Sequence, residues 1–217
     1  MAPLPMLFLA LAAAAADPGP KIDQVSCSEA NIQKIQQAWP LARKRLAAAK
    51  DAAEKAYAGT DPQLRRKVLA YAKFLDGGLD SLPDVARVLG LMDGILERGR
   101  FICGSKADKA CQSRNGYVRR GEGDVIHLCP AVMKGSKEAA EQRVRNMTHE
   151  AAHLVDARIS QPEGEGYCVV FDCELACPGK TPYLVADNWA QFTHCAGGEK
   201  PDEAFLIEAS ASSDKKR

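Results

Sequence analysis

The sequence predicts an α+β fold that is mainly helical and carries a small β-sheet pinned by disulfide bonds. Segments rich in alanine and long charged side chains, with apolar residues at helical spacing, occupy residues 28–97 and 136–158. Between them, residues 100–129 hold glycine, asparagine, three cysteines and short β-like runs, which is typical of short strands joined by disulfides. The length of 217 residues fits one domain.

Three helices are expected in the first half of the chain. The first covers residues 28–58, where Ser28 can cap it and Pro40 is expected to break or kink it. The second starts at residues 60–62, with proline in its first turn, and stops before a Gly-Gly pair. The third covers residues 81–97. Its apolar stripe consists of Val85, Val88, Leu89, Leu91, Met92 and Ile95.

The second half is expected to contain strands, a long helix, a loop and a last helix. Short strands are expected at residues 101–102, 117–118 and 125–128. The chain then turns helical over residues 136–158. A loop rich in glycine and cysteine covers residues 161–178. The last helix is expected to start at residues 181–182 and to continue through Leu184, Val185, Trp189 and Phe192.

The N-terminus has the pattern of a secretory signal peptide. Residues 6–16 form the apolar run MLFLALAAAAA, which is too short to span a bilayer and ends in small residues suited to cleavage. We therefore expect a signal peptide at 1–16, a folded domain at 17–209 and a disordered tail at 210–217. No later stretch has the length and apolar character of a membrane helix. The mature protein is thus expected to be extracellular, without a membrane partner, and monomeric.

The cysteines and the charge balance agree with export. All eight cysteines follow the expected cleavage site, and an even number in an exported chain indicates disulfide bonds. A structural zinc site is the alternative, but no CxxC pair is present. The net charge of +1 gives no reason to expect nucleic acid as a partner. The cysteines are Cys27, Cys103, Cys111, Cys129, Cys168, Cys173, Cys177 and Cys195.

Residues 149–153 read His-Glu-Ala-Ala-His within the expected helix over 136–158. Residues four apart on a helix share one face, so His149 and His153 can both direct a ring nitrogen at one metal ion. Glu150 lies beside the first ligand and can act as general base on a water bound to that ion. The pattern therefore predicts a catalytic site with one Zn²⁺ per chain, acting on protein or peptide substrates.

A catalytic zinc also needs a third protein ligand and one open position. No third histidine follows at the spacing that metzincins use. Asp172 and Glu174 lie far enough past His153 for the chain to turn back, and cysteines flank them. Asp187 is a further candidate. The residues themselves leave the choice among these three carboxylates open.

Several segments carry a resemblance to a known family. Cys-Ser at 27–28 precedes an alanine-rich helix, and Val-Ile-His-Leu-Cys-Pro stands at 125–130. Thr-His-Glu-Ala-Ala-His follows at 148–153, and Ala-Asp-Asn-Trp-Ala-Gln-Phe at 186–192. In this order and spacing they resemble the deuterolysins and peptidyl-Lys metalloendopeptidases, which together are called aspzincins.

The resemblance implies a zincin-like fold in which His149 and His153 bind zinc, Glu150 is the general base and an aspartate is the third ligand. It also implies the disulfides Cys27–Cys103 and Cys111–Cys129, and the other four cysteines would pair among themselves. Asp187 would contact substrate, because acidic residues in the family's last helix are associated with a preference for lysine after the scissile bond. Ala190 stands where the lysine-specific members carry glutamate.

This chain departs from the family at the third ligand. The family motif Gly-Thr-x-Asp-x-x-Tyr-Gly is not intact, and Asp172 is the best positional match to its aspartate. The family tyrosine helps to stabilise the oxyanion, and Tyr167, Tyr183 or His194 could substitute for it here. The primary hypothesis is thus a secreted zinc endopeptidase. The alternative is a secreted binding or effector protein that keeps a zincin scaffold without efficient catalysis, which the altered aspartate motif favours.

Overall fold

The computed structural model describes residues 19–156, 159, 173 and 184–197, and the chain in these ranges is mainly helical with a small sheet. The α+β class that the sequence predicts is therefore confirmed for the described residues. The expected signal peptide, most of the loop at 161–178 and the expected tail lie outside them. Within the described chain, no helix combines the length and apolar character needed to cross a membrane.

Helix α1, Glu29–Ala58, runs without interruption through Pro40. The expectation that the helix breaks at this proline is therefore wrong. Proline cannot donate to the carbonyl four residues earlier, which belongs to Gln36. Both Gln36 and Pro40 are exposed, so that carbonyl can bind water instead. The opposite face of α1 is buried from Ile35 to Ala56, and this packing holds the helix together.

The next two helices follow the sequence pattern closely. Helix α2, Pro62–Ala72, begins at the Asp61 cap, whose carboxylate accepts hydrogen bonds from two backbone amides at 2.8 and 3.0 Å. Short 3-10 turns at Lys73–Leu75 and Leu79–Ser81 lead into α3, Leu82–Arg98. The apolar stripe of α3 is buried as expected, except for Leu91, which is 41% exposed.

Helices α4 and α5 are both shorter than expected. Helix α4, Lys137–Val155, starts after Ser136, whose hydroxyl accepts from the amide of Ala139 at 3.2 Å. It ends at Val155, because Asp156 has an extended backbone. Helix α5, Ala186–Ala196, starts later than expected because Val185 is also extended. Residues 181–183, where its start was expected, lie outside the described chain.

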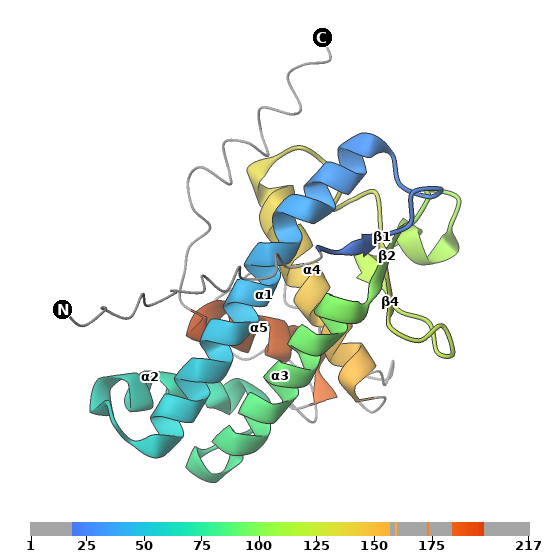
Figure 1. Ribbon diagram of the computed structural model, residues 1–217. Coiled ribbons are helices and arrows are strands. Elements are labelled where there is room, and N and C mark those ends of the chain that lie inside the picture. The colour runs from blue at the N-terminus through green and yellow to red at the C-terminus, as the bar shows by residue number, and fades with distance from the viewer. Residues whose placement is uncertain (1–18, 157–158, 160–172, 174–183, 198–217) are drawn as a thin grey trace, which may run out of the picture.

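A four-stranded sheet with the order β1-β2-β4-β3 lies at one end of the helices (Figure 1). Strands β1, β2 and β4 are parallel, and β3 pairs antiparallel with β4 at one edge. Every residue of β4 is buried, as expected of a strand covered on both faces. The sequence pattern does not predict β1, because two residues are too few to show a period. The strands are β1 Lys21–Ile22, β2 Arg100–Cys103, β3 Gly116–Tyr117 and β4 Val125–Leu128.

Three disulfide bonds join the described elements: Cys27–Cys103, Cys111–Cys129 and Cys173–Cys195. The first two are the pairs that the family resemblance implies, and both are confirmed. The third links two of the four cysteines that were expected to pair among themselves. Cys168 and Cys177 lie outside the described residues.

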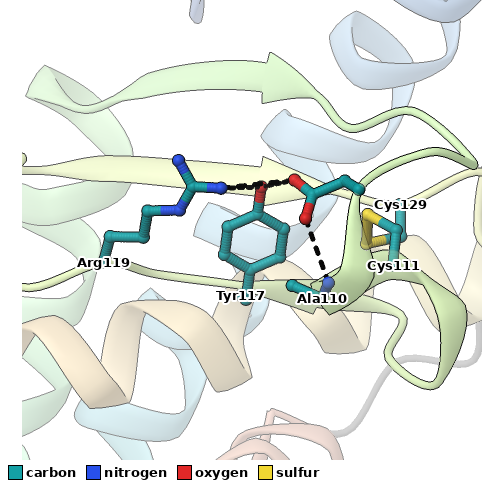
Figure 2. The surroundings of a disulfide bond; sticks show 6 residues. Ala110, Cys111, Tyr117, Arg119 and Cys129 are labelled. Atoms are coloured by element: carbon teal, nitrogen blue, oxygen red, sulfur yellow. Dashed lines mark hydrogen bonds and ion pairs between the residues drawn. A yellow bond between two sulfur atoms is a disulfide. The ribbon is translucent and has the colours of Figure 1, made fainter.

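A polar cluster holds the loop beside the Cys111–Cys129 disulfide (Figure 2). The hydroxyl of Tyr117, on the edge strand β3, donates to Asp108. Arg119 donates to the same carboxylate at 3.3 Å and to the Tyr117 oxygen at 3.2 Å. Burial, together with the hydrogen bond to Asp108, raises the pKa of Tyr117 to about 12. The cluster thereby anchors the strand that lies next to α4.

The core lies between the helices and the inner face of the sheet. Helices α1 and α3 run side by side, α4 packs against both of them, and α5 packs against α1 and α4 (Figure 1). The largest fully buried side chains come from all four helices and from the two central strands. Because α4 contacts α1, α3, α5 and β4, its position is set from every side.

Candidate metal centre

Helix α4 carries His149, Glu150 and His153, and its packing decides where these side chains lie. His149 is 8% exposed and Glu150 is 2% exposed, whereas His153 is partly buried. Fully buried alanines at positions 151 and 152 press the same turn against the core. The two histidines are one helical turn apart and therefore point in the same direction. The sequence prediction that they meet is confirmed, since their Nε2 atoms are 3.1 Å apart.

Each histidine also has a partner on its Nδ1 atom. His149 Nδ1 lies 2.9 Å from Oδ1 of Asp187 on α5, and His153 Nδ1 lies 2.7 Å from the main-chain oxygen of Ile159. A carbonyl or carboxylate oxygen accepts hydrogen bonds, so in both rings Nδ1 is the nitrogen that donates. A neutral imidazole that donates from Nδ1 has its lone pair on Nε2. The two lone pairs therefore converge on one point.

The electrostatic surroundings keep the ring of His153 neutral. Burial is the largest effect and, with the nearby charge of His149, it lowers the pKa of His153 to about 3. The positive charge of Arg114 acts in the same direction. The hydrogen bond to Ile159 and the charge of Asp187 oppose the shift without cancelling it. At neutral pH the Nε2 atom of His153 is thus available as a metal ligand.

The donor geometry fits a divalent metal ion. Two histidine nitrogens bound to one tetrahedral Zn²⁺ lie about 3.3 Å apart, given Zn–N bonds of about 2.0–2.1 Å. The 3.1 Å between the two Nε2 atoms is close to this value. A carboxylate oxygen of Glu150 lies within 4.8 Å of a ring nitrogen of each histidine, which suits a general base beside the metal position. The residues present therefore fit zinc.

A buried ion pair contacts His149 at Nδ1, the ring nitrogen that does not face the metal position. Oδ1 of Asp187 also lies 2.8 Å from Nη2 of Arg145, and these two side chains are 6% and 8% exposed. Arg145 is one turn before His149 on α4, and Asp187 is in the first turn of α5. Sequence reasoning did not single out Arg145. Its spacing of four residues before the first histidine is the signal that could have identified it.

The remaining predicted site residues fall into two groups. His194 pairs with Glu141 of α4 at 3.5 Å, and Glu141 also pairs with Arg45 of α1. Tyr167, Asp172, Glu174 and Tyr183 lie outside the described residues. The third ligand and the oxyanion stabiliser thus stay predictions. The substrate contact of Asp187 also stays a prediction, although its Oδ1 contacts Arg145 and His149 in this structure.

Comparison of the chain with protein-family models, with curated proteins and with solved structures found no match.

Proposed function

We propose that this protein is a secreted zinc-dependent metallo-endopeptidase with a zincin-like, aspzincin-type site. The observation that carries the proposal is the convergence of two Nε2 atoms, 3.1 Å apart, in histidines whose Nδ1 atoms are both engaged by acceptors. Glu150 beside them supplies the carboxylate that peptide hydrolysis needs. The three disulfides support export, since such bonds persist in oxidising compartments.

The chain's own residues perform the proton transfers in this proposal. Zn²⁺ held by His149 and His153 would supply a Lewis acid and lower the pKa of a bound water. Glu150 accepts a proton from the water whose oxygen forms the new bond to the peptide carbonyl carbon. It then donates that proton to the amide nitrogen as the C–N bond breaks, which gives a carboxylate and an amine. Because Glu150 is 2% exposed, bulk water competes little for its carboxylate.

The third ligand in this proposal is Asp172, with Glu174 as the alternative. Both positions flank Cys173, which is bonded to Cys195 of α5. Zinc quantification of two separate alanine variants, at residues 172 and 174, tests this choice. The variant that binds zinc more weakly than the wild type identifies the ligand. The proposal extends to substrates with lysine after the scissile bond, which a peptide library tests directly.

The first prediction concerns the general base. Glu150→Gln keeps the size of the side chain but cannot accept the proton, so casein hydrolysis should fall by about 10²–10⁴-fold. Zinc content should stay at the wild-type level. The matched control is Glu138→Gln, an exposed glutamate in the first turn of the same helix, which should retain full activity.

Two outcomes would contradict the proposal. Casein cleavage by Glu150→Gln at the wild-type rate would exclude the role of Glu150. Wild-type protein that binds zinc but cleaves neither casein nor a peptide library would favour the alternative, a secreted binding or effector protein on the same scaffold.

A further inference from the structure

Three buried side chains form a continuous polar chain from α4 to α5 and back. Nη2 of Arg145 lies 2.8 Å from Oδ1 of Asp187, and that same oxygen lies 2.9 Å from Nδ1 of His149. The three residues are 8%, 4% and 8% exposed, respectively. A single carboxylate oxygen therefore accepts from a guanidinium and an imidazole that belong to the same helix.

We infer that Asp187 and Arg145 are positioning residues of the metal centre, acting through His149. The inference rests on the proposed zinc site. Asp187 keeps the proton of His149 on Nδ1, which leaves the Nε2 lone pair directed at the metal position. Arg145 provides the positive charge that makes a buried carboxylate tolerable beside the imidazole.

The two histidines are oriented by different means. His153 donates to the main-chain oxygen of Ile159, only six residues further along the chain. His149 instead depends on a side chain that comes from another helix, 38 residues away in sequence. The N-terminal end of α5, where Asp187 lies, also favours a negative charge. Of the two histidines, it is thus His149 whose direction depends on the packing of α5 against α4.

If Asp187 and Arg145 only stabilised the fold, they would not control the tautomer of His149. A buried ion pair that only joins two helices affects unfolding but leaves the preferred tautomer of a neighbouring histidine unchanged. In the arrangement seen here the carboxylate selects the tautomer. Replacing it by an amide removes the anionic acceptor that the imidazole and the guanidinium share. Nε2 protonation of His149 then competes with metal binding.

The experiment measures the affinity for Zn²⁺ by competition with a chromophoric chelator. Asp187→Asn should bind zinc about 10- to 100-fold more weakly than the wild type, as is usual when the acceptor of a ligating histidine is lost. Arg145→Met should also weaken binding, and Arg145→Lys should restore part of the loss because it retains the charge. The matched control is Asp93→Asn, which breaks a 2.7 Å ion pair with Arg43 between α1 and α3 and should leave zinc affinity unchanged.

The tautomer of His149 provides a second measurement. It does not depend on catalysis, and its first part uses the wild-type protein alone. Nitrogen-15 NMR of the histidine rings in the zinc-free wild type, at a pH where the rings are neutral, should show the proton of His149 on Nδ1. In folded Asp187→Asn, a substantial share should move to Nε2. Near-UV circular dichroism establishes that each variant is folded.

The results separate this inference from the proposed function. Wild-type protein that binds no zinc would refute the zinc site, yet the NMR measurement would still test the control of the tautomer. A wild-type His149 protonated on Nε2 would overturn the positioning role. So would zinc binding by folded Asp187→Asn at the wild-type affinity.

Discussion

Glu141 of α4 shows how a half-buried acid can be held in its charged form. Its carboxylate lies 2.5 and 3.1 Å from the two terminal nitrogens of Arg45 and 3.5 Å from Nδ1 of His194. Burial would by itself raise the pKa of Glu141, but the hydrogen bonds and charges of His194 and Arg45 outweigh it and lower the pKa to about 2. These three side chains thus join α1, α4 and α5 electrostatically.

The sign of this shift predicts a pH dependence of stability. The folded-state pKa of Glu141 lies below the ordinary value of 4.5, so its stabilisation is complete above pH 4.5 and is lost as pH falls through about 2. Glu141→Gln should therefore reduce the free energy of unfolding by up to about 3 kcal/mol at pH 6. The difference from wild type should shrink progressively between pH 4.5 and 2.

Urea unfolding at a series of pH values measures this difference. Glu54→Gln is the control, because Glu54 makes an exposed ion pair with Lys50 that should contribute little at any pH. A Glu141→Gln difference that stays constant from pH 6 to pH 2 would show that Glu141 is not held at a lowered pKa.

At the scale of elements, the edge strand β3 approaches α4 as closely as its backbone permits. A Cβ atom at Gly116 would overlap Oδ1 of Asn146 on α4 and would lie 2.8 Å from the main-chain oxygen of His127. Glycine is thus required here for close packing. A second glycine offers a contrast, because a Cβ at Gly90 within α3 would meet Cε of Lys50 at an ordinary distance of 3.6 Å.

The two glycines should therefore respond to alanine with opposite signs. Gly116→Ala forces β3 away from α4 and should destabilise the protein by about 1–3 kcal/mol. Gly90→Ala adds helix propensity without a clash and should stabilise it by about 0.5–1 kcal/mol. Urea unfolding of both variants checks this pair, and equal effects of one sign would refute the packing argument.

At the scale of the whole molecule, the disulfides close loops of very different length. Cys27–Cys103 spans 76 residues and joins the start of α1 to β2, whereas Cys111–Cys129 spans 18 residues and joins the 3-10 turn before β3 to the end of β4. In the chain-entropy account, the stabilisation grows with the logarithm of the closed loop. The longer cross-link should therefore matter more to the global fold.

The expected costs follow from these lengths. Replacing both Cys27 and Cys103 by serine should cost about 4.5 kcal/mol, and replacing Cys111 and Cys129 about 3 kcal/mol. Thermal unfolding of the two double variants provides the comparison. A larger loss from the shorter loop would show that local packing around Cys111–Cys129, including the Asp108–Tyr117–Arg119 cluster, outweighs chain entropy.

Much of the local structure and part of the site could be predicted from the sequence. Asp61 lies in the expected start of α2 and caps it, whereas Ser28, the expected cap of α1, takes the N-cap position without a side-chain capping hydrogen bond. The meeting of His149 and His153 could also be predicted, because a spacing of four residues on a helix places side chains together whatever surrounds it. The disulfides Cys27–Cys103 and Cys111–Cys129 were available only through a family resemblance, since cysteine spacing does not define pairing.

The sequence by itself determined which residues share a helix face, and hence the histidine pair and Glu150. Only the tertiary structure decided that Asp187 and Arg145 stand behind His149, that α1 continues through Pro40, and that α5 begins at Ala186. The physical reason is the distance along the sequence over which each interaction acts. Helix geometry and caps act over about four residues, whereas a buried ion pair between two helices depends on how segments distant in sequence pack.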